Sequence, residues 1–348
     1  MKFLKKRLQG YQPYVPGWQP ADGEDWVKLN TNESPWPPSP KVVEAIRAAA
    51  GESLRLYPSP LATPARRAIA KAYGVEEDMV ALANGGDELL EMAFRAFAGA
   101  GDRVAFPVPS YPLLDPLCDV HEVEAAHHEL DEDWSLPAAF AADPAPLKFL
   151  VNPNSPTGTW FSKAEVERVL RESRGVVLLD EAYVDFAPET RVDLLRDGHE
   201  NLVILRTLSK SFALAGLRVG FALASPGLIA ALDVVKDSYN LDRLAIAGTV
   251  AAVEDMAYHD RLVEFVVGER TWLADRLRER GFEVAPSATN FVFTRPPRQA
   301  SEVAAALKKR RVLVRHYDRP PIDGWFRITI GTREQHERLL AALQEILV

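Results

Sequence analysis

Short apolar runs alternate with amphipathic segments through the middle of the chain, from residue 80 to residue 235. The runs at 175–180 and 202–206 are continuously apolar until a polar residue ends them, which is typical of strands buried on both faces. Segments with apolar residues at helical spacing accompany these runs, at 63–73, 89–98 and 163–172. This alternation predicts an α/β fold, with a mostly parallel central sheet flanked by helices.

The order of the elements changes in the last third of the chain. Long helices are expected at 241–256 and 260–280, and short strands then mix with helices. These strands are predicted at 282–284, 290–294, 312–314 and 326–330, and the helices at 301–311 and 334–347. The pattern predicts a large domain over residues 35–265 and a small α+β domain over residues 266–348. Residues 1–34 are rich in Pro, Trp and Tyr, so we expect an irregular arm that contributes to the small domain and to a subunit interface.

Composition excludes several classes of function. The chain has 348 residues and a formal charge of −8, with no basic stripe of the kind that binds nucleic acid. Cys118 is the only cysteine, so no disulfide within the chain is possible, and a cytoplasmic location is expected. No apolar run reaches the roughly 18 residues of a membrane span, and no apolar signal-peptide core follows the basic residues of 1–10. No Cys/His spacing resembles a zinc site, so no metal is expected.

Polar residues gather where four of the predicted strands end. In an open α/β sheet, ligands bind outside the carboxyl ends of the strands, so these groups are expected to converge although they are far apart in sequence. The four groups are residues 84–88, 152–158, 180–183 and 207–210.

Each group has a chemical reading and a plain structural one. Lys210 lies between two serines and could bind an aldehyde, although a lysine in such a loop is more often simply solvated. Asp180 ends an apolar strand and needs a cationic partner, which a protonated pyridine nitrogen would provide. The structural alternative is an ordinary salt bridge or a helix N-cap. Residues 85–87 open a helix and could bind phosphate with Arg218, or form an ordinary turn and a surface ion pair. Residues 152–158 could donate hydrogen bonds or serve only as a turn.

Taken together, the groups describe one ligand. It has an aldehyde for Lys210, a basic ring nitrogen for Asp180, a phenolic oxygen for an asparagine or tyrosine, and a phosphate for a helix N-terminus and Arg218. Pyridoxal 5′-phosphate has all of these features.

The chain resembles the fold-type I pyridoxal-phosphate-dependent aminotransferases from about Tyr14 to its C-terminus, and most closely the histidinol-phosphate aminotransferases. The motifs that carry the resemblance are Lys28–Glu33, Arg55–Pro58, Asn84–Glu88, Pro109–Tyr111, Asn152–Gly158, Asp180–Tyr183, Thr207–Gly220 and Phe326–Thr332.

The resemblance implies a role for each candidate residue. Lys210 is expected to form the internal aldimine and then to move the proton of the 1,3-shift, while Asp180 keeps the ring nitrogen protonated. Tyr183 is expected to bind the phenolic oxygen. Many relatives read Asn-Pro-Thr-Gly, but Ser155 holds that asparagine position here, so we assign its contact to Asn154. The remaining cofactor contacts are expected from Gly86, Asp87, Tyr111, Thr207, Ser209 and Arg218.

The resemblance also implies how substrate and subunits are bound. Arg327 is expected to bind the substrate anion, with Arg315 and Tyr14 as further candidates. Tyr57 is expected to reach the cofactor phosphate of the neighbouring subunit, which implies a homodimer with sites at its interface.

The expected reaction is a ping-pong transamination in histidine biosynthesis. Histidinol phosphate and 2-oxoglutarate would be interconverted with imidazole-acetol phosphate and glutamate. Three alternatives stay open: an aromatic or broad-specificity amino-acid aminotransferase, threonine-phosphate decarboxylase, and a non-catalytic cofactor-binding regulator. Such regulators carry a basic DNA-binding module ahead of the domain, and the N-terminal arm is expected to be too short for one.

Overall fold

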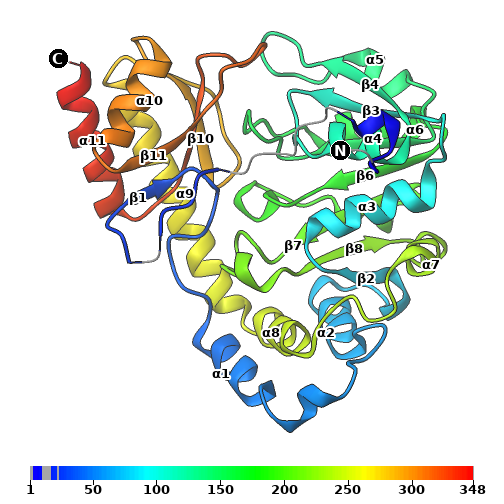
Figure 1. Ribbon diagram of the computed structural model, residues 1–348. Coiled ribbons are helices and arrows are strands. Elements are labelled where there is room, and N and C mark those ends of the chain that lie inside the picture. Colours follow the sequence, from blue (N-terminus) through cyan, green and yellow to red (C-terminus); the bar gives the residue numbers. More distant parts are fainter. Residues whose placement is uncertain (1–2, 10–16, 22, 348) are drawn as a thin grey trace.

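The computed structural model describes residues 3–9, 17–21 and 23–347, and it contains two β-sheets (Figure 1). The larger sheet has seven strands in the order β2-β8-β7-β6-β5-β3-β4. Four neighbouring pairs are parallel, and the two pairs that include β8 are antiparallel, which confirms the mostly parallel sheet. The bounds are Val80–Ala83 (β2), Arg103–Val108 (β3), Glu124–Glu129 (β4), Leu147–Val151 (β5), Val176–Asp180 (β6), Leu202–Thr207 (β7) and Gly220–Ala224 (β8).

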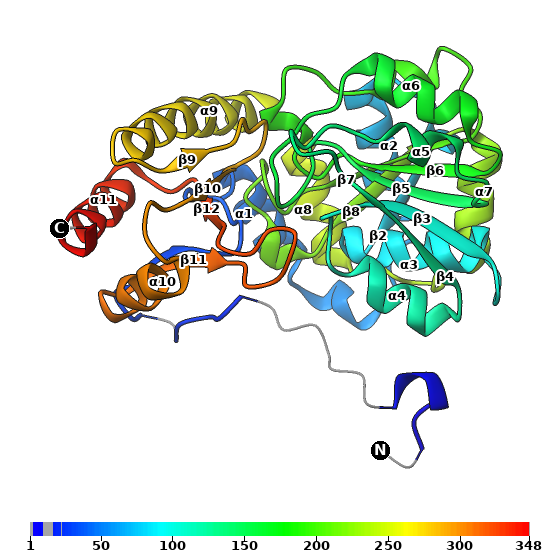
Figure 2. The same cartoon turned by 90° about the horizontal axis from the view of Figure 1, so that it is seen from above.

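Helices cover both faces of this sheet, as the view from above shows (Figure 2). In β6, Val177 and Leu179 pack on one side with helices α2, α5, α6 and α8, whereas Leu178 packs on the other side with α3, α4 and α7. The sheet is therefore buried on both faces, as its continuous apolar runs predict. The helices are Pro40–Ala49 (α1), Thr63–Tyr73 (α2), Gly86–Phe97 (α3), Leu114–His121 (α4), Ala138–Ala142 (α5), Lys163–Glu172 (α6), Pro226–Val235 (α7) and Arg243–Val253 (α8).

Local signals fix the ends of two of these helices. At the start of α6, the Ser162 hydroxyl accepts the backbone N–H of Glu165, and the Glu165 carboxylate accepts the N–H of Ser162. This is the expected capping box, which satisfies two amides that the helix leaves unpaired. Helix α2 ends at Gly74, whose φ of +63° is in the left-handed region that glycine adopts at little cost.

The smaller sheet has five strands in the order β1-β11-β12-β10-β9 (Figure 1). Its first strand, Val27–Leu29 (β1), pairs parallel with β11, and Lys6–Leu8 forms a 3-10 helix (η1). The expectation of an irregular arm over residues 1–34 is therefore wrong for these residues. The other elements are Glu283–Val284 (β9), Phe291–Arg295 (β10), Val312–His316 (β11), Phe326–Thr329 (β12), Met256–Arg278 (α9), Ala300–Lys309 (α10) and Arg333–Leu347 (α11).

The long helix α9 connects the two sheets. It follows α8, packs on β9 and β10, and also contacts a 3-10 turn, Val184–Phe186 (η4), that follows β6 of the larger sheet. No helix in the described part of the chain is long and apolar enough to cross a membrane.

Candidate active site

A cavity of about 730 Å³ lies where the strand-end loops of the larger sheet face the smaller sheet. The loops after β5, β6 and β7 contribute Ser155, Tyr183 and Lys210 to its wall. The smaller sheet contributes Arg315 and Arg327, and the structure thus brings together groups that are far apart in sequence. The wall also includes Asn30, Thr31, Asn32, Phe106, Tyr111 and the loop 316–322.

Asp180 is the most strongly perturbed group beside this cavity. It is 8% exposed, and its carboxylate accepts the backbone N–H of Ala182 at 2.9 Å. Burial raises the pKa of Asp180 to about 7, and the nearby carboxylate of Asp87 adds to this rise. In the described residues, no cationic side chain lies within ion-pair distance of Asp180. The charge of Lys210 lowers this pKa only in part, and a ligand with a protonated nitrogen would supply a direct ion-pair partner.

Lys210 and Tyr183 face each other across the cavity. The Lys210 Nζ lies 5.7 Å from the centre of the Tyr183 ring. The Tyr183 hydroxyl accepts the Asn32 Nδ2–H at 2.9 Å, and Asn32 in turn accepts the Thr329 hydroxyl at 3.1 Å through its Oδ1. Because the Tyr183 oxygen accepts from Asn32, its own proton can be donated into the cavity. Sequence reasoning missed Asn32, and its only signal was its place in the motif Lys28–Glu33.

The N-terminus of α3 forms a tight cradle with Arg218. Gly85 precedes the helix with a φ of +88°, and a Cβ on it would lie 2.5 Å from the Arg218 Nη2. A Cβ on Gly220 would lie 2.6 Å from the carbonyl carbon of Gly85, so both glycines allow a close approach. Asp87 lies in the first turn of α3, with its carboxylate 3.5 Å from the Arg218 Nη2, and it accepts the Tyr111 hydroxyl at 2.9 Å. Amides of Gly86 and Asp87 at a helix N-terminus, with a guanidinium beside them, suit an anion.

Thr207, the last residue of β7, and Ser209 directly precede Lys210 in the sequence. The Thr207 hydroxyl accepts the backbone N–H of Ser209 at 3.1 Å and lies 2.9 Å from the Ser209 hydroxyl. Both residues are buried, and these bonds hold the turn between β7 and Lys210.

The loop after β5 turns Asn154 away from the cavity. Its amide nitrogen donates to the Pro109 carbonyl at 3.0 Å and to the Thr157 hydroxyl at 2.9 Å, and the side chain is 1% exposed. Ser155 lines the cavity instead, and its hydroxyl accepts the Arg327 Nη1–H at 3.2 Å. With one amide hydrogen donated to Pro109 in the loop after β3 and the other to Thr157, Asn154 has none left for a ligand oxygen, which argues against the contact assigned to it.

Two arginines lie side by side on the smaller sheet. Arg315 in β11 and Arg327 in β12 are directly opposite each other in an antiparallel pair, and both line the cavity. Arg327 also donates to the Asn30 carbonyl at 3.3 Å. Paired guanidinium groups at a cavity wall can bind a carboxylate or a phosphate.

Tyr57 lies on the surface outside this cavity. It is 78% exposed, and its ring stacks on Tyr239 with the centres 4.5 Å apart. The remaining candidate, Tyr14, lies outside the described residues.

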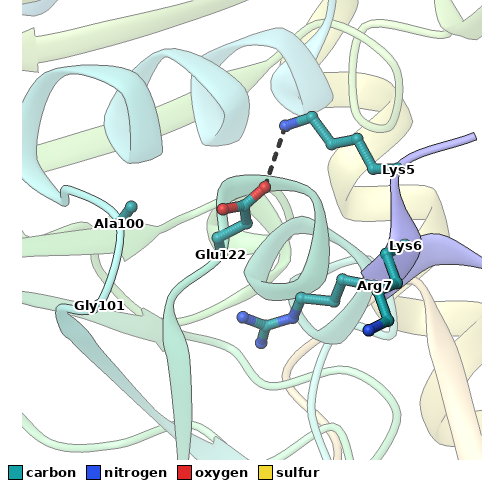
Figure 3. Close-up of a pocket in the computed structure, with 6 residues that line it drawn as sticks. All are labelled: Lys5, Lys6, Arg7, Ala100, Gly101 and Glu122. Atoms are coloured by element: carbon teal, nitrogen blue, oxygen red, sulfur yellow. Dashed lines mark hydrogen bonds and ion pairs between the residues drawn. The ribbon is translucent and has the colours of Figure 1, made fainter.

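A second cavity, of about 830 Å³, lies beside η1 and is shown in Figure 3. Its wall is formed by Lys5, Lys6, Arg7, Ala100, Gly101 and Glu122, and Lys5 reaches Glu122 at 3.3 Å. None of the candidate site residues described above lines it, so we place the candidate active site in the first cavity.

Comparison with known proteins adds independent evidence. Residues 24–343 match the model of the family "Aminotransferase class I and II". The chain is 43% identical over 344 residues to a histidinol-phosphate aminotransferase of Geotalea uraniireducens, covering 99% of each chain. It is 46% identical to histidinol-phosphate aminotransferase 1 of Bordetella parapertussis, covering 96% of each.

Solved structures agree with these sequence relatives. The histidinol-phosphate aminotransferase of Sinorhizobium meliloti in complex with pyridoxal 5′-phosphate superposes with a TM-score of 0.85 at 28% identity, covering 92% of this chain and 90% of that one. A threonine-phosphate decarboxylase of Porphyromonas gingivalis, at 23% identity and a TM-score of 0.76, shares the fold. With a family match over almost its whole length, the chain belongs to the class I and II aminotransferases.

Proposed function

We propose that this protein is a pyridoxal-phosphate-dependent aminotransferase that interconverts histidinol phosphate and 2-oxoglutarate with imidazole-acetol phosphate and glutamate. Its sequence relatives named for this activity, at 42–46% identity over nearly the full length, favour this reaction over the alternatives. The observation that carries the chemistry is the buried carboxylate of Asp180, which has no ion-pair partner in the described part of the chain and lies near Lys210, a residue of the cavity wall.

The residues around the cavity fit pyridoxal 5′-phosphate. The ionised Asp180 carboxylate would accept a hydrogen bond from the protonated ring nitrogen, and the cradle at Gly85 and Gly86 with Arg218 would hold the phosphate. Tyr111 would lie against the ring, with Thr207 and Ser209 near the phosphate. For the phenolic oxygen we propose Tyr183 and Ser155, since the Asn154 amide already donates to the Pro109 carbonyl and the Thr157 hydroxyl. When bound, the cofactor supplies an aldehyde for amino groups and a protonated ring that withdraws electrons from the substrate α-carbon.

The chain's own groups then bind, orient and move protons. The Lys210 Nζ accepts the proton that leaves the α-carbon of the amino donor, and it returns a proton later in the same half-reaction. Asp180, ionised once a cation faces it, keeps the ring nitrogen protonated. Asn32 holds the Tyr183 hydroxyl so that its proton points to the bound oxygen.

Both substrates use the same site in turn. Glutamate enters and 2-oxoglutarate leaves, and then imidazole-acetol phosphate enters and histidinol phosphate leaves. We propose that Arg327, with Arg315 beside it, binds the α-carboxylate of glutamate in one half-reaction and the phosphate of the other substrate in the second. The same pair of guanidinium groups can bind both anions. A carboxylate and a phosphate each present two oxygen atoms that match the planar, forked N–H groups of an arginine.

We also propose that the protein is a cytoplasmic homodimer, with a large domain over residues 35–265 and a small domain over 266–348. The dimer is supported by a group of exposed apolar residues around Tyr57, which a partner subunit would cover. These residues are Leu54, Leu56, Leu61 and Tyr239, each more than 40% exposed. The cytoplasmic location is supported by the single cysteine of the chain.

Half-reaction assays test the proposed reaction. Protein reconstituted with pyridoxal phosphate is mixed with histidinol phosphate, phenylalanine or phosphothreonine, and the change in its visible spectrum gives a rate for each. We expect histidinol phosphate to react fastest, and Lys210→Ala to lose the visible band that the wild-type protein gains with the cofactor. A preference for phenylalanine, or release of carbon dioxide from phosphothreonine, would refute the proposed substrate.

A further inference from the structure

A buried ionic cluster lies directly behind the loop that carries Lys210. It consists of Arg206, Glu181, Asp185 and His259, and the mechanism above uses none of them. The side chains of Arg206 and Glu181 are 4% and 0% exposed, and those of Asp185 and His259 are 16% and 7% exposed. Charged groups buried to this extent are costly unless they are paired.

Arg206 joins two carboxylates that come from one short segment. Its Nη1 donates to the Glu181 Oε2 at 3.1 Å, and its Nη2 donates to the Asp185 Oδ1. Glu181 also accepts the Thr190 hydroxyl at 2.6 Å and the backbone N–H of Arg191 at 2.7 Å. The end of β7, where Arg206 lies, is thereby fixed to the segment after β6.

Asp185 also binds the loop on the far side of Lys210. Its Oδ2 accepts the hydroxyl proton of Ser211, the residue after Lys210, and lies 3.4 Å from the Nε2 of His259 in α9. The His259 ring packs against Phe212 with the centres 4.3 Å apart. Four elements therefore meet at one carboxylate: the segment after β6, strand β7 through Arg206, the lysine loop and helix α9.

The cluster favours the ionised form of Asp185. Burial raises the pKa of Asp185, but Arg206 and His259 outweigh that effect and hold it below its usual range. Burial lowers the pKa of His259, and its bonds to Asp185 and Asp260 outweigh this and raise it. A hydrogen bond from a hydroxyl to an ionised carboxylate is stronger than one between neutral groups.

The arrangement of the two segments places this bond next to the reacting groups. Tyr183 faces the cavity, and Asp185, two residues later, faces the cluster. Lys210 faces the cavity, and Ser211 faces the cluster. The bond from Ser211 to Asp185 is thus a direct link between the backbone segments that carry Lys210 and Tyr183.

We propose that Asp185 is a positioning residue for Lys210, which acts through the Ser211 hydroxyl to hold the lysine loop against the segment of Asp180 and Tyr183. The inference rests on the proposed function, because it concerns the reaction of Lys210 with the cofactor aldehyde. In that reaction the Nζ adds to the aldehyde carbon, a C=N bond replaces the C=O bond, and one water leaves. A loop that holds the Nζ near its attack position makes this step faster without changing how the phosphate and ring are bound.

The test separates lysine positioning from cofactor binding. Cofactor-free wild-type protein and the variants Ser211→Ala and Asp185→Asn are mixed with pyridoxal phosphate, and the rate of C=N formation is followed in the visible spectrum. Their affinity for pyridoxamine phosphate is measured separately, because this form has an amine in place of the aldehyde and cannot condense with lysine. Ser173→Ala and Asp193→Asn serve as matched controls, since Ser173 caps α6 and Asp193 binds Lys163 at the surface.

We expect condensation at least tenfold slower in both variants, affinity for pyridoxamine phosphate within twofold of wild type, and unchanged controls. The double variant should be no slower than the slower single one, because both changes remove the same link. Ser211→Ala removes no charge, so it tests whether the bond from Ser211 to Asp185 positions Lys210 even if Asp185→Asn does not fold.

Wild-type condensation rates in a folded Ser211→Ala protein would overturn the inference while leaving the proposed function intact. A parallel loss of affinity for pyridoxamine phosphate would also overturn it, because the cluster would then support the whole site. A wild-type protein that binds neither form of the cofactor would instead refute the proposed function, and this inference with it.

Discussion

Replacing Asp180 with asparagine should make the cofactor-free protein more stable at alkaline pH. Asparagine has nearly the same shape and can still accept the N–H of Ala182, but it never carries a charge. In the wild-type protein, burial raises the pKa of Asp180 from 3.8 to about 7, so the folded state resists ionisation of this group. Removing this carboxylate should therefore stabilise the fold while impairing function, which is the stability–activity trade-off found at many active sites.

The size of the effect follows from the pKa difference between the folded and unfolded chains. A difference of about 3 units corresponds to about 4 kcal/mol, at about 1.4 kcal/mol per unit. Below pH 3.8 the group is protonated in both states and the penalty is absent. Between 3.8 and 7 the unfolded chain binds fewer protons than the folded one, so wild-type stability falls as the pH rises. Above pH 7 the full penalty of about 4 kcal/mol applies.

Urea unfolding of the cofactor-free proteins at pH 5, 6, 7 and 8 measures this difference. We expect Asp180→Asn to gain stability over wild type progressively, up to about 4 kcal/mol at pH 8. With pyridoxal phosphate present the order should reverse, because only the ionised carboxylate pairs with a ring cation. A difference between the two proteins that stays constant across this pH range would refute the reasoning, as would a less stable variant at pH 8.

Three further changes probe other parts of the molecule. Arg327→Gln should lower kcat/KM about 10–100-fold with both glutamate and histidinol phosphate, because each loses a charged hydrogen bond; an unaffected glutamate reaction would contradict a shared anion site. Gly85→Ala should weaken cofactor binding at least tenfold in a spectroscopic titration, because its Cβ would lie 2.5 Å from the Arg218 Nη2 at a φ of +88°; undiminished affinity would show that the cradle can relax. His336, fully buried, accepts the N–H of Gly331 at 2.8 Å, and burial lowers its pKa, so wild-type stability should fall as the pH drops below about 6.5. His336→Gln should flatten this pH dependence in thermal unfolding, and equal slopes would exclude His336 as the cause.

Local signals made much of the fold predictable. The helices at 63–73 and 163–172 have the bounds expected from the sequence, because a left-handed glycine ends one and a capping box begins the other. The parallel strands of the larger sheet were predictable because burial on both faces leaves continuous apolar runs.

Features that depend on remote partners were not predictable. Strand β1 has three residues and forms because β11, almost 300 residues later, offers it backbone hydrogen bonds. Strand β8 was missed because its first residue, Gly220, is also the last residue of the lysine motif Thr207–Gly220, with no turn signal between them. In the site, the position of Asn154 depends on the Pro109 carbonyl, and the role of Asn32 depends on Tyr183. No local pattern encodes such pairings, whereas Asp180 and Lys210 are predictable because one ends an apolar strand and the other lies in the turn just after one.

The hairpin of β11 and β12 carries two parts of the cavity wall: the paired arginines on its strands and the loop at its tip. The register sets Arg315 opposite Arg327, and backbone bonds between Tyr317 and Trp325 and between Gly324 and Tyr317 close the loop just beyond. Ile322 and Trp325 pack with Phe293 and anchor this loop, while its tip at 318–321 lines the cavity. The tip can therefore be exchanged or lengthened without moving the two arginines. For protein engineering, the hairpin tip is therefore the place to change which substrate side chains the enzyme accepts, while the two arginines continue to bind the substrate anion.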